Sequence, residues 1–254
     1  MASYWTRSKW EKVFVSEIWG TPGLHILSVE PDFMHTCCLG VLQSLLGNIL
    51  WEVFSSMGGT ITKHRSALAK LLSMIHVASR RLGCEPPINQ LTIGMIRSKA
   101  TGKPKCKTKA AEGRKLLPVV VFILQNFVPC DGGHEKLRMQ CAINLLKVYE
   151  ELAAWVDKDG LSLANMKKYG MRHLLLYAEL ARGQERIGES LLWALLPKHH
   201  LFAHVVQDMS CNPKNTWAYR LEDEIGKAAD LAAGVNIEHM HTAFIMRLRA
   251  LYDS

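Results

Sequence analysis

The sequence lacks the features that mark membrane-spanning, secreted and disulfide-stabilised proteins. No uninterrupted run approaches the roughly 20 apolar residues that cross a bilayer, and the leader Met1–Ser8 lacks the apolar core of a signal peptide. Seven cysteines, an odd number without a framework spacing, favour reduced and mostly buried thiols. These absences predict an intracellular protein that has no membrane partner.

Recognisable metal and base-reading motifs are missing as well. His199, His200 and His204 are closely spaced, but neither an HExxH pattern nor a CxxC pair accompanies them. The sequence therefore does not predict a structural metal. It also contains no zinc finger and no basic zipper, so sequence-specific reading of DNA bases is not indicated.

Positive charge is concentrated in one segment of the chain. The formal net charge is +8. Glu112 is the only acid among the eight basic residues of segment 97–115, which Gly102, Pro104 and Gly113 interrupt. We predict a flexible basic loop within a single helical domain spanning residues 1–254. The basic residues are Arg97, Lys99, Lys103, Lys105, Lys107, Lys109, Arg114 and Lys115.

Such a loop suits nonspecific contact with DNA, because each phosphate that a lysine or arginine neutralises releases counterions. Two other interpretations remain open for the same residues. The segment is an ordinary solvated loop, or it is a nuclear localisation signal that directs an intracellular protein to the nucleus.

Apolar residues recur at helical spacing along most of the chain, which predicts a mainly α, multi-helix protein with little or no β-sheet. One helix is expected between Pro31 and Gly58, a second capped by Thr62, and later helices capped by Ser162 or running over 185–196. Residues 116–124 are almost continuously apolar, and periodicity alone does not distinguish helix from strand there.

Four segments resemble motifs of the CACTA and Plavaka transposases, in the order found in that family. Asp32-Phe33-Met34-His35 is similar to its Asp-x-Met-His signature. The segments 115–119 and 196–204 resemble its Leu-Leu-Pro-Val helix and its Pro-x-His-x-Leu-x-x-His motif, and 217–226 resembles its final acidic helix. The resemblance covers most of the chain. It favours helix for residues 116–124, where Pro118 suits a first turn.

The resemblance implies a ribonuclease-H-like DDE transposase, here a helical insertion plus a remnant of the core. Such enzymes hold two Mg²⁺ ions about 4 Å apart between three carboxylates. Glu222 aligns with the last of these acids and would be the metal ligand, although Asp223 and Glu224 leave its register open. The two earlier aspartates would lie upstream of Met1. Magnesium is therefore expected only if another source completes the site.

The candidate catalytic residues Asp32, His35 and Glu222 each have a structural alternative. Asp32 can cap the helix that follows it, and His35, beside an apolar helix, can be a hydrogen-bonded core residue. Glu222 can belong to a solvated acidic first turn.

The sequence therefore predicts a transposase-derived protein that is inactive alone and binds DNA nonspecifically. One rival hypothesis is a non-catalytic helical module that binds a protein partner. The other is a nuclease that becomes active when a second chain supplies the missing aspartates.

Overall fold

The computed structural model describes residues 32–155, 160–186 and 191–215, and these residues are mainly α-helical, as predicted. Within these ranges the only β-type pairing is an isolated bridge between Arg97 and Pro104. Glu222 and the helices predicted around it lie outside the described residues. In chain order the elements are the π-helix η3 (Met34–Val41), α2 (Leu42–Ser56), α3 (Arg65–Arg81), α4 (Ile93–Ile96), α5 (Ala110–Asn126), α6 (Gly133–Ala153), α7 (Leu161–Arg186), α8 (Pro197–Asp208) and the 3₁₀ turn η4 (Pro213–Asn215).

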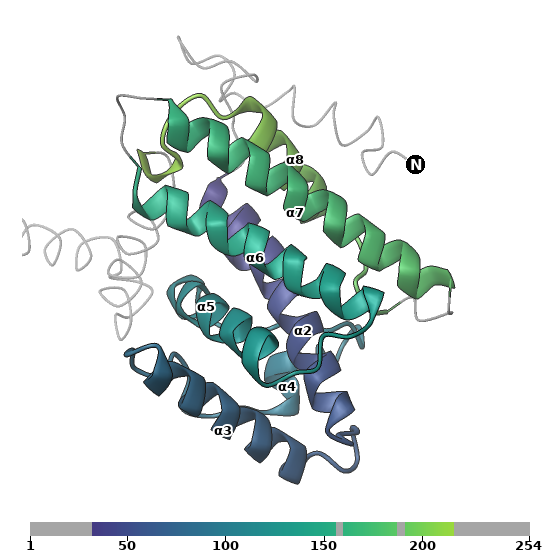
Figure 1. Ribbon diagram of the computed structural model, residues 1–254. Helices are drawn as coiled ribbons and strands as arrows, with labels where there is room; N and C mark the ends of the chain where they lie inside the picture. The colour runs from purple at the N-terminus through teal and green to yellow at the C-terminus, as the bar shows by residue number, and fades with distance from the viewer. Residues whose placement is uncertain (1–31, 156–159, 187–190, 216–254) are drawn as a thin grey trace, which may run out of the picture. The chain divides into compact units, whose positions relative to one another are not determined.

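The π-helix η3 continues directly into α2, and together they form the central rod around which the other helices pack (Figure 1). Leu45, Leu46 and Phe54 have no exposed surface. By length and composition the stretch Met34–Ser56 could cross a membrane, but 89% of its most apolar window is buried inside the protein. Burial in a protein core requires the same apolar composition, so the stretch is weak evidence for a membrane span.

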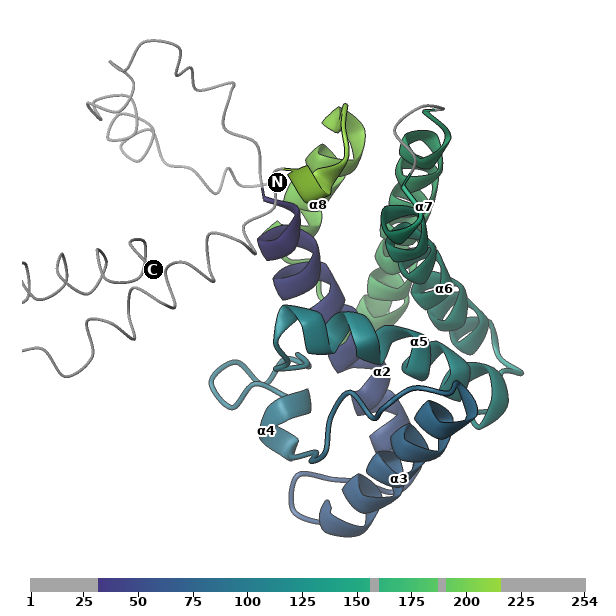
Figure 2. The same ribbon diagram turned by 90° about the vertical axis from the view of Figure 1, so that its left-hand side faces the viewer.

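The helices α3 and α5 lie on one side of this rod, and both begin elsewhere than predicted (Figures 1 and 2). The helix α3 begins at Arg65 with His64 at its N-cap position, so Thr62 is not its cap. The helix α5 begins at Ala110, within the segment predicted to be a loop. Pro118 therefore lies in the middle of α5, where it removes one backbone hydrogen bond, and not in a first turn.

The helices α6 and α7 lie side by side along most of their length in both views (Figures 1 and 2). The helix α7 starts at Leu161, so Ser162 lies inside its first turn instead of capping it. Regular helix continues to Arg186. The short helix predicted over 185–196 is wrong for residues 191–196, of which 191–193 form a turn and 194–196 are irregular, while residues 185 and 186 belong to the end of α7.

A buried ion cluster joins α2, α6 and the connection that leads to α8. Glu52 on α2 accepts hydrogen bonds from Arg138 Nη1 at 2.8 Å, from His134 Nε2 at 2.9 Å and from Trp193 Nε1. Burial raises the pKa of Glu52, but these hydrogen bonds and the nearby positive charges outweigh it and leave the pKa below its usual value. Trp193 also donates its backbone N–H to Asn48 Oδ1 at 2.8 Å. We call Glu52, His134, Arg138 and Trp193 the Glu52 cluster.

Two neutral histidines lie among aromatic rings between α6, α7 and α8. Tyr177 stacks on His199 with ring centroids 4.3 Å apart, and its hydroxyl bonds to Ser44 at 2.8 Å. His173 donates from Nδ1 to the carbonyl of Cys141 at 2.9 Å, and His199 Nδ1 accepts the backbone N–H of Leu196 at 3.0 Å. Burial lowers the pKa of both His173 and His199 to about 4, so these rings are uncharged at neutral pH.

Candidate nucleic-acid interface

The basic segment 97–109 connects α4 to α5 and is hydrogen-bonded to the helices beneath it. The Arg97–Pro104 bridge closes a turn in which the Ser98 N–H donates to the Lys103 carbonyl at 2.9 Å. Beyond the turn, the N–H groups of Lys105 and Lys107 donate to carbonyls of Ile96 and Met95 at 3.0 and 2.7 Å. The chain here doubles back along α4, and backbone hydrogen bonds set its path.

A second set of hydrogen bonds fastens the same segment to α2. The Cys106 N–H donates to the Gln43 carbonyl at 2.8 Å, and Gln43 Nε2 donates to the Thr108 carbonyl at 2.8 Å. At Gly47 a Cβ atom would lie only 2.4 Å from the Lys105 backbone nitrogen. The glycine therefore permits a close approach that any other residue would prevent.

Burial alternates from residue to residue along this segment. Pro104, Cys106, Thr108 and Ala110 are buried, whereas Lys105, Lys107 and Lys109 are exposed, and Lys103 is half-buried. Alternation with a period of two is characteristic of extended chain, in which successive side chains point to opposite sides. Burial raises the pKa of the Cys106 thiol to about 12, so the inward side is uncharged. We call Lys103, Lys105, Lys107 and Lys109 the lysine ridge.

The other four predicted basic residues are placed differently. The Arg97 guanidinium lies over the Trp51 ring, 4.3 Å from its centroid, and that of Arg114 lies 5.8 Å from the centroid of Tyr149. Both arginines are half-buried, whereas Lys99 and Lys115 are exposed. Stacking on an aromatic face orients a guanidinium while its charge persists. The predicted set thus divides into the lysine ridge, two arginines that pack against aromatic rings, and two further exposed lysines.

Glu112, the only acid in the segment, caps the helix that follows. Its Oε2 accepts the backbone N–H of Lys109 at 2.9 Å, which satisfies a donor at the start of α5. A negative charge in the first turn of a helix is also favourable. The one acid therefore serves α5, and no ion pair joins it to a ridge lysine among the described residues.

Lys198 joins the basic surface from the start of α8, and the sequence analysis missed it. Its Nζ donates to the carbonyls of His35 and Leu39 at 2.9 and 3.1 Å, in the space left by Gly40. Burial and the nearby positive charge of Lys105 lower the pKa of Lys198. Two lysines far apart in sequence are thus held close enough to repel each other. The sequence offers no sign of this contact beyond the position of Lys198 after Pro197.

The same contact brings two of the transposase-like segments together. Lys198 belongs to segment 196–204 and His35 to the Asp-x-x-His segment, and the rings of Phe33 and Phe202 also meet with centroids 6.2 Å apart. The segment 115–119 lies within α5. The fourth, 217–226, lies outside the described residues.

Asp32 and His35 interact with each other at the start of η3. Asp32 Oδ2 accepts the His35 backbone N–H at 2.7 Å and lies 2.8 Å from His35 Nδ1. The first of these contacts is the N-terminal hydrogen bond that we considered for Asp32. Nearly half of the His35 side chain is exposed, so it is not the buried core residue of the alternative interpretation. Glu222, the third candidate catalytic residue, lies outside the described residues.

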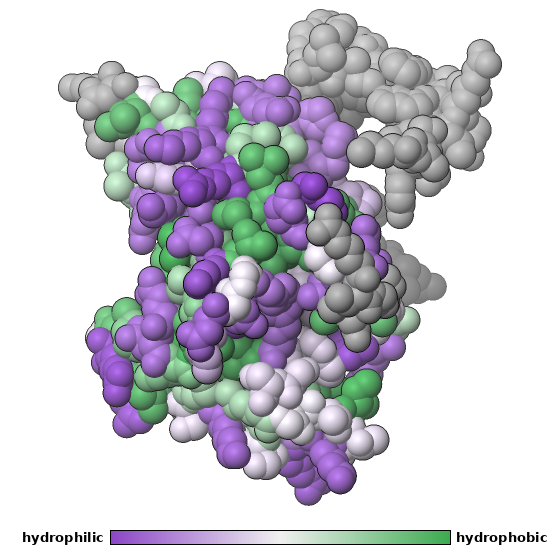
Figure 3. Space-filling view, turned by 45° about the vertical axis from the view of Figure 1, so that its right-hand side comes forward, coloured by the Kyte–Doolittle hydropathy of each residue, from purple (hydrophilic) through white to green (hydrophobic). Residues whose placement is uncertain are grey.

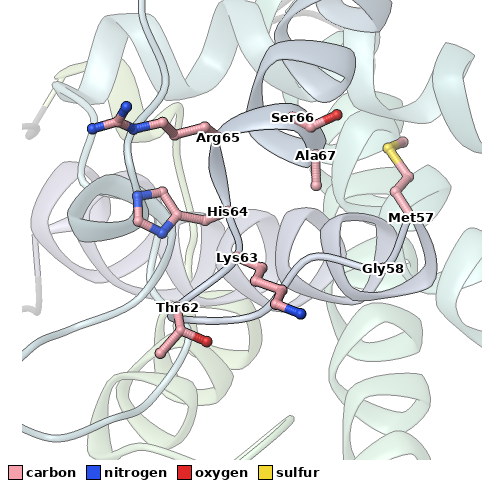
Figure 4. A pocket seen from close by; sticks show the side chains of 8 residues that line it. All are labelled: Met57, Gly58, Thr62, Lys63, His64, Arg65, Ser66 and Ala67. Carbon is pink, nitrogen blue, oxygen red and sulfur yellow. The ribbon is translucent and has the colours of Figure 1, made fainter.

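A separate pocket of about 560 Å³ lies at the start of α3 and is open to solvent. Figure 4 shows that its basic side chains diverge: those of His64 and Arg65 point away from that of Lys63. His64 Nδ1 lies 2.8 Å from the Ile61 carbonyl, a local contact within the loop. The pocket therefore gathers no convergent set of polar groups. Its lining comprises Met57, Gly58, Thr62, Lys63, His64, Arg65, Ser66 and Ala67.

Comparison of the chain with protein-family models, with curated proteins and with solved structures finds no match.

Proposed function

We propose that the protein binds DNA through electrostatic contacts between the lysine ridge and the phosphate backbone, without recognising base sequence. The observation that carries the proposal is the exposure of Lys105, Lys107 and Lys109 on one side of a backbone that is hydrogen-bonded to α2 and α4. Because that backbone is ordered, less conformational entropy is lost on binding than for a disordered lysine tract.

The spacing of the ridge suits a polyanion. In extended chain, side chains two residues apart on one side are separated by about 6.8 Å, which is comparable to the spacing of successive phosphates along a nucleic-acid strand. The repulsion between Lys105 and Lys198 adds to this argument, since a phosphate near both ammonium groups would relieve it. Contacts of this kind position a protein on DNA and carry no sequence information.

The transposase origin is part of the proposal, and the motif segments support it. The contact between segments 32–35 and 196–204 is consistent with a shared ancestral site, because both contain residues that the family resemblance singles out. Strand transfer is not proposed. The proposal concerns an inherited DNA-binding surface, and its test does not depend on catalysis.

The test is the salt dependence of binding to a duplex DNA of arbitrary sequence. The logarithm of the association constant should fall linearly with the logarithm of salt concentration, with a slope of about −0.9 for each phosphate neutralised. Replacing Lys105, Lys107 and Lys109 together by serine should make that slope less negative by about 2 to 3. Changing the DNA sequence should leave the affinity nearly constant.

A charge-matched control keeps this experiment specific. Lys63, Lys70 and Arg80 are exposed residues in or just before α3. Replacing them by serine also removes three positive charges, as many as the ridge variant loses. This control should retain most of the wild-type slope. Binding that does not depend on salt, or equal losses in the two triple variants, would overturn the proposal.

Exposed apolar side chains favour a protein partner as the second candidate function. Leu191, Leu195 and Leu201, around the connection into α8, are 40%, 57% and 40% exposed. Figure 3 also shows apolar side chains reaching the surface in the middle of one face. Exposed apolar patches often mark interaction sites. If this function dominates, capture from nuclease-treated extract should retain a stoichiometric protein partner, and the lysine replacements should leave that capture unchanged.

A further inference from the structure

The exposed side of α8 carries three chemically related side chains at helical spacing. His200, His204 and Asp208 are four residues apart in turn, so all three lie along one face of the helix. All three are exposed, whereas Phe202 and Val206 on the other side are buried in the core. The buried side fixes the helix, and the three polar side chains are therefore presented from a rigid support.

The two imidazole rings face each other through the same nitrogen. His200 Nε2 and His204 Nε2 are 3.1 Å apart, and the rings are nearly perpendicular with centroids 4.6 Å apart. Asp208 Oδ2 lies 3.6 Å from His204 Nδ1. That distance is too long for a hydrogen bond, but the negative charge favours the tautomer with its proton on Nδ1. This tautomer directs the Nε2 lone pair of His204 toward His200.

We propose that His200 and His204 bind one transition-metal ion through their Nε2 atoms. With metal–nitrogen bonds of about 2.0–2.1 Å, two nitrogens 3.1 Å apart subtend an angle of roughly 100° at the metal, between the octahedral and tetrahedral values. Imidazole ligands suit Zn²⁺, Cu²⁺ and Ni²⁺, whereas Mg²⁺ takes oxygen ligands. The site is therefore distinct in its chemistry from the carboxylate site implied by the transposase resemblance.

The carboxylate of Asp208 completes the arrangement as a positioning group. Histidines that bind metals commonly direct their second ring nitrogen toward a carboxylate, which orients the ring and makes it a stronger ligand. Among the described residues no group of three or more histidine, cysteine or acidic side chains is placed to hold a metal. Water, or a donor from another molecule, would fill the remaining coordination positions.

The experiment is a titration of the full chain with Ni²⁺, in which calorimetry measures the binding affinity. Ni²⁺ is chosen because imidazole binds it well and because it does not oxidise the exposed thiols of Cys84 and Cys211 as Cu²⁺ would. His200→Ala and His204→Ala should each weaken the tightest site at least tenfold. Asp208→Asn should weaken it by less than tenfold, because Asp208 is exposed and does not hydrogen-bond to His204, whereas hydrogen-bonded outer-shell partners contribute a factor of about 10 to 100.

His64→Ala is the matched control, because His64 is another partly exposed histidine, in the loop before α3. It should leave the Ni²⁺ affinity unchanged. A hydrogen bond between the two Nε2 atoms is the alternative explanation of the 3.1 Å contact. In that case His200→Ala and His204→Ala would bind Ni²⁺ as tightly as the wild type, and the proposal would be overturned. Circular dichroism at matched concentration confirms that each variant is folded.

Discussion

The protein places its basic residues in two contrasting environments. In the Glu52 cluster, Arg138 is buried and forms an ion pair with Glu52 at 2.8 Å, while His134 and Trp193 donate to the same carboxylate. In the lysine ridge, Lys105 and Lys107 are exposed, and no described acid lies within ion-pair distance of them. The first group satisfies its charges internally. In the lysine ridge the charges point toward solvent, and the positive charge of Lys105 is also repelled by that of Lys198.

This contrast separates cations that hold the fold together from cations available to a partner. Removing a buried partner leaves an uncompensated charge in the protein interior, which is costly. Removing an exposed lysine changes stability little but removes one contact with a polyanion. Stability and DNA affinity should therefore respond to different residues, and the following predictions test that separation.

The largest expected effect comes from Arg138→Met, which leaves the buried Glu52 without the arginine of its ion pair. Breaking a buried ion pair from one side typically costs about 3–5 kcal/mol of unfolding free energy. We expect a loss of this size in urea unfolding at pH 7. The DNA affinity of the folded variant should equal that of the wild type, because the ridge is unchanged.

Two further variants make this prediction specific. Adding Glu52→Gln to Arg138→Met removes the stranded charge and should recover part of the lost stability. Arg182→Met breaks an exposed pair with Glu179 and should cost less than about 1 kcal/mol. A loss below about 1 kcal/mol for Arg138→Met would show that the Glu52 cluster contributes little to stability.

The next effect is a loss of stability in mild acid, caused by His173 and His199. Their pKa values fall from 6.5 to about 4 on folding, so the unfolded chain binds more protons between those values. Their contribution is complete above pH 6.5 and is lost as the pH falls toward 4. Between pH 6.5 and 5 the unfolding free energy should fall by about 1.5 kcal/mol for each histidine.

Two other described groups with shifted pKa values, Glu52 and His134, do not reduce the stability between pH 6.5 and 5. Glu52 has a lowered pKa, so its contribution is lost only as the pH falls below its ordinary value of 4.5. The hydrogen bond to Glu52 raises the pKa of His134, so its contribution is complete below pH 6.5 and is lost only at higher pH. His199→Asn retains an acceptor for the Leu196 N–H and should roughly halve the pH dependence measured by urea unfolding. An unchanged pH dependence would contradict the assignment.

The sequence predicts the helices well because their apolar positions repeat at the helical period. Leu45, Leu71 and Leu145, predicted to lie inside helices, are all fully buried. The sequence did not predict the ordered backbone of segment 97–109, although the lysines of that segment alternate with a period of two. Its inward positions include Pro104 and Thr108, which are not strongly apolar, and the nearby glycines and prolines suggested irregular chain.

The sequence did not predict contacts between segments that are far apart in the chain. The positions of Lys198 beside Lys105 and of Trp193 beside Glu52 depend on how helices pack, and no local pattern encodes them. Trp193 even adopts a positive φ of 52°, which is unfavourable for a bulky residue and is held by its hydrogen bonds to α2. For Asp32, by contrast, the local rule for helix starts was sufficient to predict its hydrogen bond to the His35 N–H.

A smaller loss of stability than those from Arg138→Met or from mild acid is expected for Gly47→Ala, which links the lysine ridge to α2. The added methyl would lie 2.4 Å from the Lys105 backbone nitrogen, so the ridge must move away from α2. Overpacking of this kind costs about 1–3 kcal/mol, while replacing glycine in a helix returns about 1 kcal/mol, so the net loss should be about 1 kcal/mol. The salt dependence of DNA binding should weaken because the lysines lose their common alignment.

Gly133→Ala is the control. No atom lies within 4 Å of its new methyl, so neither stability nor DNA binding should become weaker. If Gly47→Ala retains wild-type stability and DNA affinity, the ridge does not depend on its seat against α2, and an unstructured lysine tract would explain DNA binding equally well.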